Sequence, residues 1–131
     1  MLEYIKFQDQ LFSIIIRAGY DAEGIKFFTP NDLSQQLAYM KRPKGYLIQP
    51  HIHNPVPREV SFTHEVLFIR RGVVKVNFFS PVKEFIESRT LIAGDVILLA
   101  GGGHGFEIIE EAEIIEVKQG PYAGEGDKIR F

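Results

Sequence analysis

The chain has 131 residues, of which 45% are hydrophobic and 24% charged, an ordinary composition for one globular domain. Fifteen basic and seventeen acidic residues leave a formal net charge of −2, which argues against a nucleic-acid-binding surface. The chain has no cysteine, so disulfides, thiolate metal sites and cysteine nucleophiles are excluded.

The first six residues lack the basic region and long apolar stretch of a secretory signal, and no apolar run approaches the roughly 20 residues of a membrane helix. We therefore expect a cytoplasmic protein that binds neither nucleic acid nor membrane. No repeat, low-complexity segment or long linker divides the chain. We expect one domain over residues 1–131, with its core at about 45–120 and residues 1–44 packed on it.

The first third of the chain predicts one strand and one helix. Residues 11–17 are rich in β-branched side chains and are bounded by Gly19, which is typical of a strand. Thr29 and Pro30 then provide a helix cap and a first helical residue. Leu33, Leu37 and Met40 follow at helical spacing, so we expect a short helix that ends at Pro43 and Gly45. The basic residues at 41–44 fit the end of such a helix.

From Gly45 onward the pattern changes to short strands separated by turns. Such a series is typical of an all-β sandwich or barrel. The predicted strands span residues 46–53, 66–71, 73–79, 84–91, 96–99, 106–109 and 114–119. Turns are expected at 80–83 and 93–95, at the glycines 101–103, and at the acidic residues between the last two strands.

Three histidines and one glutamate stand out as candidate metal ligands. His51 and His53 are two apart, so on a strand both imidazoles point to the same face. Glu65 shares parity with the apolar residues that follow it, and a carboxylate on an apolar face is costly unless it is paired or binds a cation. His64 has the opposite parity and is expected at the surface or behind the ligands. His104 follows the glycines 101–103, which place an imidazole at the barrel mouth.

The spacing of these residues resembles the two motifs of the cupin family. In the first motif five residues separate a glycine from His-x-His, and six residues separate the glutamate from a second glycine. Gly45 and Gly72 stand at these positions here. The second motif begins with glycine and ends near a histidine, which Gly94 through His104 match loosely. The resemblance covers about residues 45–120. It implies a cupin-type double-stranded β-helix, or jelly-roll barrel, with one short N-terminal helix.

Two features depart from the family pattern. Eleven residues separate His53 from Glu65, where cupins usually have a much shorter spacer, so we expect an ordered loop over the barrel mouth. The loop makes Glu59 a rival carboxylate, although only Glu65 has the correct distance to Gly72. In the second motif Ala100 replaces the usual proline, and one residue is missing before His104.

The resemblance implies one divalent transition metal bound by His51, His53, Glu65 and His104. This nitrogen and oxygen donor set suits Zn, Fe, Ni or Mn. A metal-free barrel, in which the histidines only form hydrogen bonds, is the alternative.

Cupins differ in function, and the fold does not choose among their activities. Our first hypothesis is a small metalloenzyme, an isomerase or epimerase acting on a carbohydrate or nucleotide-linked sugar, because the chain resembles stand-alone cupins associated with surface polysaccharide synthesis. The alternatives are a non-catalytic ligand-binding or sensory module, and an Fe(II)-dependent dioxygenase.

Three further residues are candidates for holding the small-molecule ligand. Arg58 is able to bind a carboxylate or phosphate with two hydrogen bonds, and Lys118 and Tyr122 are expected at the rim. Each has a plainer interpretation as a surface charge or packing aromatic. The family also implies a homodimer, for which residues 11–17 are the natural edge strand.

Overall fold

The computed structural model describes all residues from 1 to 131, and it is all-β apart from one 3-10 turn, η1 (Gly124–Asp127). The chain divides into two compact units. The first, here called the sheet unit, comprises Met1–Tyr20 and Thr63–Phe131, and the second, the hairpin unit, comprises Asp21–Phe62. No helix has the length and apolar character needed to cross a lipid bilayer.

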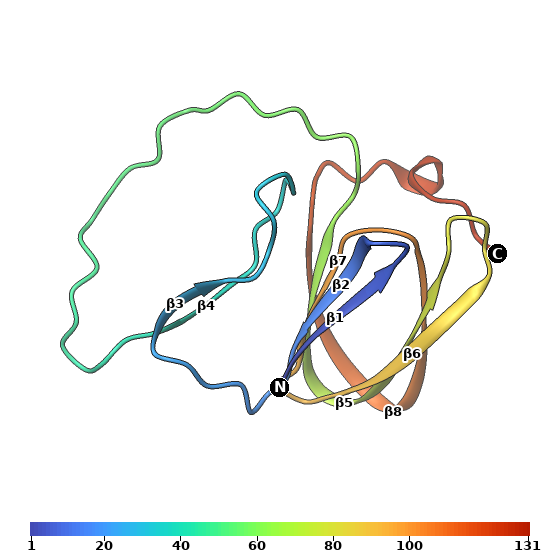
Figure 1. Cartoon of the computed structure of the whole chain (residues 1–131), viewed down its shortest axis with the longest axis horizontal. Coiled ribbons are helices and arrows are strands. Elements are labelled where there is room, and N and C mark those ends of the chain that lie inside the picture. The colour runs from blue at the N-terminus through green and yellow to red at the C-terminus, as the bar shows by residue number, and fades with distance from the viewer. The chain divides into compact units, whose positions relative to one another are not determined.

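The sheet unit is one antiparallel sheet that curls into half a barrel (Figure 1). Its strands are β1 (Leu2–Phe7), β2 (Gln10–Ile16), β5 (Glu65–Phe79), β6 (Phe85–Ile92), β7 (Val96–Leu99) and β8 (Gly103–Lys118). They run in the order β1-β2-β7-β5-β6, and β8 pairs with β5. The all-β prediction is thus confirmed, and the curled sheet fits a barrel fold.

Strands β5 and β8 are the longest, and each joins two segments that the sequence predicts as separate strands. The start of β5 pairs with β7 and its end with β6, while β8 pairs with β5 over nearly its whole length. The turn predicted between residues 109 and 114 is wrong, because the acidic residues continue β8. The pairing of β8 with β5 has three register shifts in this region, and these irregularities let the two strands bend.

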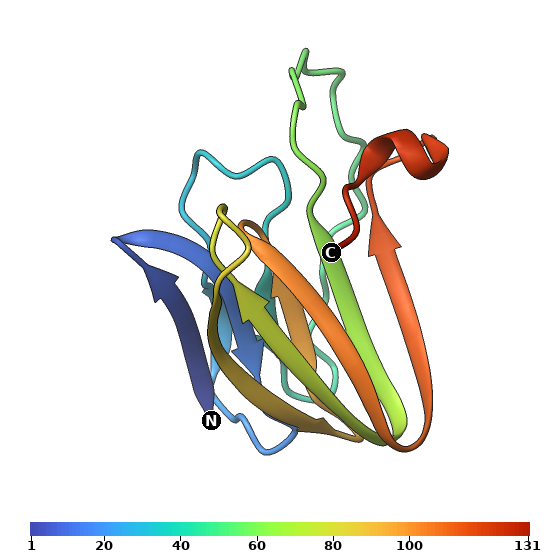
Figure 2. The ribbon, with the colours of Figure 1, turned by 90° about the vertical axis from the view of Figure 1, so that its right-hand side faces the viewer.

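The bend in this strand pair is centred on Gly72, which has a φ of +93°. A Cβ atom built on Gly72 would lie 2.1 Å from the carbonyl oxygen of Glu111 on β8. Only glycine fits both this backbone angle and this close approach. Figure 2 shows β5 and β8 bending together, so that both ends of each strand rise from the bend.

The core fills the concave face of the curled sheet. Alternate side chains of β5 point into it, first Leu67 and Ile69 and, after the bulged bend, Val74, Val76 and Phe78. The other strands complete it with Ile5, Phe12, Ile15, Leu91, Ile97 and Leu99. This alternation defines the inner face of β5. Glu65 lies on this face, and so do the β8 residues that pair with the inward residues of β5.

Strand β2 confirms the prediction at residues 11–17, but it is not an edge. It pairs with β1 on one side and with β7 on the other, so the prediction of a free edge strand there is wrong. The sequence analysis missed β1, which forms a hairpin with β2 through Gln8 and Asp9. Both residues have positive φ, as two-residue hairpin turns require.

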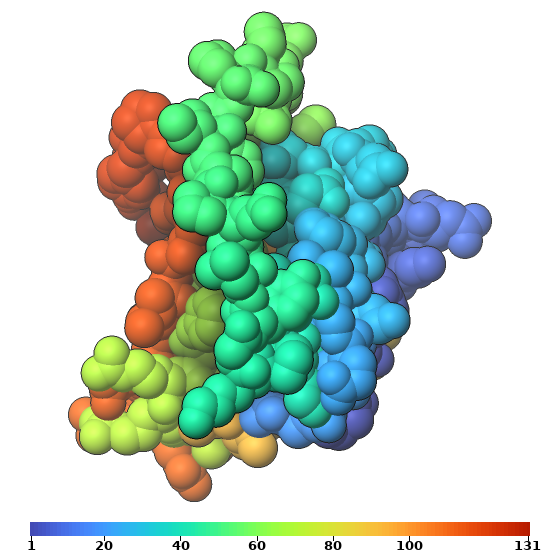
Figure 3. All heavy atoms as spheres, turned by 90° about the vertical axis from the view of Figure 1, so that its left-hand side faces the viewer, coloured from blue at the N-terminus to red at the C-terminus, as the bar shows by residue number.

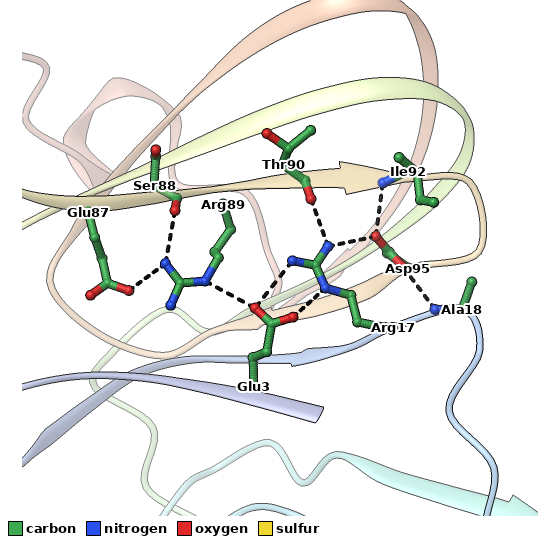
Figure 4. Close-up of polar contacts among 9 residues, drawn as sticks. All are labelled: Glu3, Arg17, Ala18, Glu87, Ser88, Arg89, Thr90, Ile92 and Asp95. Carbon is green, nitrogen blue, oxygen red and sulfur yellow. Dashed lines mark hydrogen bonds and ion pairs between the residues drawn. The ribbon is translucent and has the colours of Figure 1, made fainter. Parts of the chain in front are cut away.

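A buried polar network fixes the β6–β7 turn to the β1–β2 hairpin (Figure 4). Asp95 is 1% exposed, and its carboxylate accepts hydrogen bonds from the backbone N–H groups of Ala18 and Ile92. Arg17 donates to the same carboxylate at 3.0 Å and also pairs with Glu3. The buried charge of Asp95 is thus fully compensated, and its role is structural.

The hairpin unit holds a two-stranded sheet, β3 (Gly24–Phe27) and β4 (Ala38–Lys41), where the sequence predicts a helix. The helix prediction is wrong. The Thr29 hydroxyl accepts from the N–H of Leu37, eight residues on, and the Gln36 side chain donates to the carbonyls of Pro30 and Leu33. These bonds close a loop between two strands, and strand pairing outweighs a stripe of only three apolar residues.

The strand predicted at residues 46–53 is also wrong. Residues 42–62 form no strand. Figure 3 shows the atoms of the stretch after about residue 45 as a continuous green band on the surface. Its exposed side chains include Leu47 and Ile52. Proline at positions 50, 55 and 57 removes backbone donors that a strand ladder would need.

We predict that Gly72→Ala destabilises the sheet unit by about 2–3 kcal/mol, because the Cβ atom meets the backbone of β8 and φ is positive. Urea unfolding followed by circular dichroism measures the change. Gly126→Ala is the control, since its Cβ atom would meet nothing within 4 Å. Equal stability of the two variants would show that the bend does not depend on glycine.

We also predict a pH-dependent contribution from Glu3, whose pKa is lowered from 4.5 mainly by its hydrogen bond from Arg17. A depressed carboxyl pKa stabilises the fold above pH 4.5 and loses this contribution as the pH falls through the lower value. Glu3→Gln should therefore cost about 1 kcal/mol at pH 7, and the difference from wild type should shrink below pH 4.5.

Thermal unfolding between pH 7 and pH 3 tests this expectation. Glu125→Gln is the matched control, because Glu125 pairs with Arg130 at 3.0 Å on the exposed surface. It should change stability little at any pH. A Glu3 variant as stable as wild type at pH 7 would contradict the proposed contribution.

Candidate functional site

Glu65 begins β5 and points to the inner face of the sheet. It shares this face with Leu67 and Ile69, as its parity in the sequence predicts, and its side chain is only 16% exposed. Burying a carboxylate beside apolar side chains is costly unless partners compensate it. The position of Glu65 therefore requires cations or hydrogen-bond donors nearby.

The first partner of Glu65 is His104, near the opposite end of the strand pair. His104 lies on β8 directly across from Phe78, so it shares the inner face. Because β5 and β8 bend together at Gly72, the two ends of the pair face each other across the concave side. The Nε2 atom of His104 lies 3.1 Å from Oε2 of Glu65. The structure thus brings together two residues that are 39 positions apart in the sequence.

This contact determines the charge state of Glu65. The hydrogen bond from His104 lowers the pKa of Glu65 to about 2, and this outweighs the opposing effect of burial. The carboxylate is therefore ionised at any physiological pH. An ionised carboxylate beside an imidazole is a pair of ligands that a divalent cation prefers.

Lys118 and Tyr122 also lie at this position. Lys118 is the cross-strand partner of Glu65, and its Nζ is 3.7 Å from Oε1 of Glu65. Its ammonium also lies 5.5 Å from the centre of the Tyr122 ring. Four of the residues singled out in the sequence, Glu65, His104, Lys118 and Tyr122, are therefore neighbours in the sheet unit.

Two members of this cluster were missed in the sequence. Glu116 lies 3.4 Å from the ammonium of Lys118 and raises the pKa of that lysine. The Phe106 ring packs against His104 with ring centres 5.7 Å apart. Each is two residues from a recognised residue on the same strand, so strand parity could have found both. The prediction of a turn within β8 concealed that signal.

His51 and His53 belong to the hairpin unit. Although no strand forms there, the two rings are neighbours, with centres 5.1 Å apart. The Nδ1 atom of His51 is 2.8 Å from the carbonyl oxygen of Gln49. A carbonyl only accepts hydrogen bonds, so Nδ1 carries the proton and Nε2 keeps its lone pair for a ligand bond. Metal-binding histidines commonly have such a backbone partner.

Arg58 and Glu59 are exposed in the hairpin unit. Neither lines the open hollow of about 600 Å³ in this unit, which is lined by His51, Arg42 and Tyr46 among others. The guanidinium of Arg42 stacks on the Tyr46 ring, with its carbon 4.6 Å from the ring centre. Arg42 is thus oriented by an aromatic neighbour, whereas Arg58 has no such support.

His64, expected at the surface or behind the ligands, is not at the surface. It is only 5% exposed, and burial lowers its pKa. Its backbone N–H donates to the Gln119 side chain at 2.7 Å.

The predicted site residues therefore form two groups, one in each unit. Glu65, His104, Lys118 and Tyr122 lie in the sheet unit, and His51, His53, Arg58 and Glu59 in the hairpin unit. Neither unit by itself gathers three His, Asp or Glu side chains that would hold a metal ion. The four predicted ligands are thus divided equally between the two units.

Comparison with protein-family models, with curated proteins and with solved structures finds no match to this chain. The resemblance to cupins therefore rests on the motif spacing in the sequence alone. Any function of the chain has to follow from the chemistry of the residues that the fold brings together.

Proposed function

We propose that the chain is a metal-binding cupin in which His51, His53, Glu65 and His104 bind one divalent transition metal. The observation that carries this proposal is the 3.1 Å approach of His104 Nε2 to Glu65 Oε2 on the inner face of the curled sheet. The pair joins one residue from each of the two cupin-like motifs. The two imidazoles of the hairpin unit would complete the donor set.

The donor atoms fit such a metal ion. Two ligand atoms bound to one ion at about 2.1 Å, with an angle between right and tetrahedral, lie roughly 3.0–3.4 Å apart. The separation of Nε2 and Oε2 in the sheet unit, 3.1 Å, falls within this range, and His104 would release its Nε2 proton when a metal took the place of this hydrogen bond. His51 supplies a free Nε2 lone pair, since its Nδ1 is bonded to Gln49. Three nitrogens and one oxygen suit Zn, Fe, Ni or Mn.

Glu65 is a better carboxylate ligand than Glu59. Glu65 is ionised, mostly buried and held by His104, so its orientation is fixed before any ligand arrives. Glu59 is exposed, and a free side chain loses more rotamer entropy when it binds a metal. The six-residue spacing from Glu65 to Gly72 also places Glu65 on the strand that bends toward His104.

On the ligand side, we propose a carbohydrate or nucleotide-linked sugar and an isomerase or epimerase activity. A bound metal would supply Lewis-acid polarisation of a sugar carbonyl. Lys118 is able to pair with a phosphate or carboxylate, and the Tyr122 ring offers an apolar face for a sugar or base. Arg58 is the proposed second contact to an anionic group. The family resemblance also implies a homodimer.

We predict that protein purified without a metal-binding tag contains about one equivalent of a transition metal. The variants His51→Ala, Glu65→Gln and His104→Ala should each lose it, because each removes one of four ligands. Elemental mass spectrometry measures the content. Glu59→Gln is the matched control and should retain the metal. Metal-free wild type after reconstitution with Zn, Fe, Ni and Mn would overturn the proposed metal site.

We further predict that Tyr122→Ala and Arg58→Ala each weaken the binding of a sugar nucleotide about tenfold, because an aromatic face and a charged partner are lost. Isothermal titration with a panel of nucleoside diphosphate sugars measures the affinity. Tyr4→Ala is the control, since the Tyr4 ring also lies under a lysine, Lys6, at 6.0 Å, but on β1. Unchanged affinity in the first two variants would remove these residues from the ligand site. Binding without turnover would identify a non-catalytic module.

A further inference from the structure

Lys118 has no function as a metal ligand, yet it lies beside the carboxylate that we propose as one. Its ammonium carries no lone pair and cannot coordinate a cation. The Nζ atom is 3.7 Å from Oε1 of Glu65 and 3.4 Å from Oε1 of Glu116, and the lysine side chain is 26% exposed. A fixed positive charge at this distance opposes the approach of a second cation to Glu65.

The two oxygens of Glu65 are engaged from different sides. Oε2 faces His104, the proposed fellow ligand, and Oε1 faces Lys118. Strand register fixes this arrangement, because Lys118 is the direct cross-strand partner of Glu65. Lys118 therefore cannot move away from Glu65 without a change of rotamer. It also has a second carboxylate, Glu116, to which it can turn.

We infer that Lys118 is a counter-cation that competes with the metal for Glu65 and so limits the affinity of the site. The inference rests on the proposed metal site and assigns a new role to Lys118 within it. In the metal-free protein Lys118 places a positive charge beside Glu65 and, with His104, compensates its buried carboxylate. When a metal binds, its charge repels the ammonium, which shifts toward Glu116. Glu116 thus provides an alternative partner for the displaced charge.

The test compares metal affinities of wild type, Lys118→Met and Lys75→Met by competition with a chromophoric chelator, using the metal found in the purified protein, or Zn²⁺ where none is found. Lys118→Met should bind the metal about fivefold more tightly, because a nearby positive charge is removed while a side chain of similar length remains. Lys75→Met is the matched control: Lys75 pairs with Glu107 at 3.7 Å on the outer face of the same two strands. It should leave the affinity unchanged.

Glu116→Gln provides a second, opposite readout. Without Glu116 the ammonium keeps Glu65 as its one carboxylate partner, so metal affinity should fall about threefold. In the Lys118→Met background the same substitution should have a much smaller effect, since no ammonium remains to be redirected. A residue that only supports the fold would lower the affinity in every variant. This readout also keeps the inference testable if Lys118→Met folds poorly.

The outcomes separate the inference from the proposed function. Metal binding that is equal or weaker in Lys118→Met than in wild type, with Lys75→Met unchanged, overturns the role of Lys118 and leaves the metal site intact. Absence of metal binding in wild type and in Lys118→Met alike overturns the metal site and the inference with it. Tighter binding in Lys118→Met alone supports both.

Discussion

The bend of the β5–β8 strand pair at Gly72 is the constraint on which the rest of the sheet unit depends. Two long antiparallel strands would normally keep their ends apart by the length of the pair. At Gly72 a positive φ and the contact with the Glu111 backbone turn both strands together. As a result, Glu65 and His104, which lie at opposite ends of the strand pair, come together, with Nε2 of His104 3.1 Å from Oε2 of Glu65. The contact between Glu65 and His104 is therefore a consequence of the bend, which forms at a position where only glycine fits.

The same bend explains the electrostatics of the site. It places a carboxylate on a face that is otherwise a hydrophobic core, and partners must compensate the cost of burying that charge. His104 and Lys118 do so at different oxygens of Glu65, Oε2 and Oε1. The buried carboxylate of Asp95 is compensated by backbone N–H groups and by Arg17. Both of its oxygens accept hydrogen bonds, and the side chain is closed to solvent. Glu65 remains partly accessible, and its partners are side chains that can move. This difference is the reason that Asp95 is a structural carboxylate and that Glu65 is the one proposed as a ligand.

The sequence predicted the parts of the molecule that depend on strand parity and on glycine. The inner position of Glu65 follows from its alternation with Leu67 and Ile69. At Gly72 the sequence predicted a break between two strands, whereas the structure has one strand, β5, that bends there. Strand β7 was predicted with its observed limits. The helix predicted at residues 29–43 does not form, because the Thr29 hydroxyl accepts from the Leu37 N–H and the Gln36 side chain donates to the Pro30 carbonyl, which closes a loop between paired strands. Such long-range pairing leaves no periodic signal in the sequence. Glu116 was missed because the acidic stretch of β8 resembles a turn in composition, and only pairing with β5 makes it a strand.

The division of the four proposed ligands between two units has a consequence for metal binding. Glu65 and His104 are fixed by paired strands, so little conformational entropy remains to be lost at that half of the site. His51 and His53 lie in a stretch that forms no strand, although the hydrogen bond of His51 to Gln49 already selects its tautomer. Part of the free energy of metal binding would then be offset by fixing this stretch, as in other proteins whose metal site is incomplete before the metal arrives. Metal affinity would be limited by the cost of fixing His51 and His53 and by the charge of Lys118. Glu65 and His104, held by the bend at Gly72, would bind the metal first.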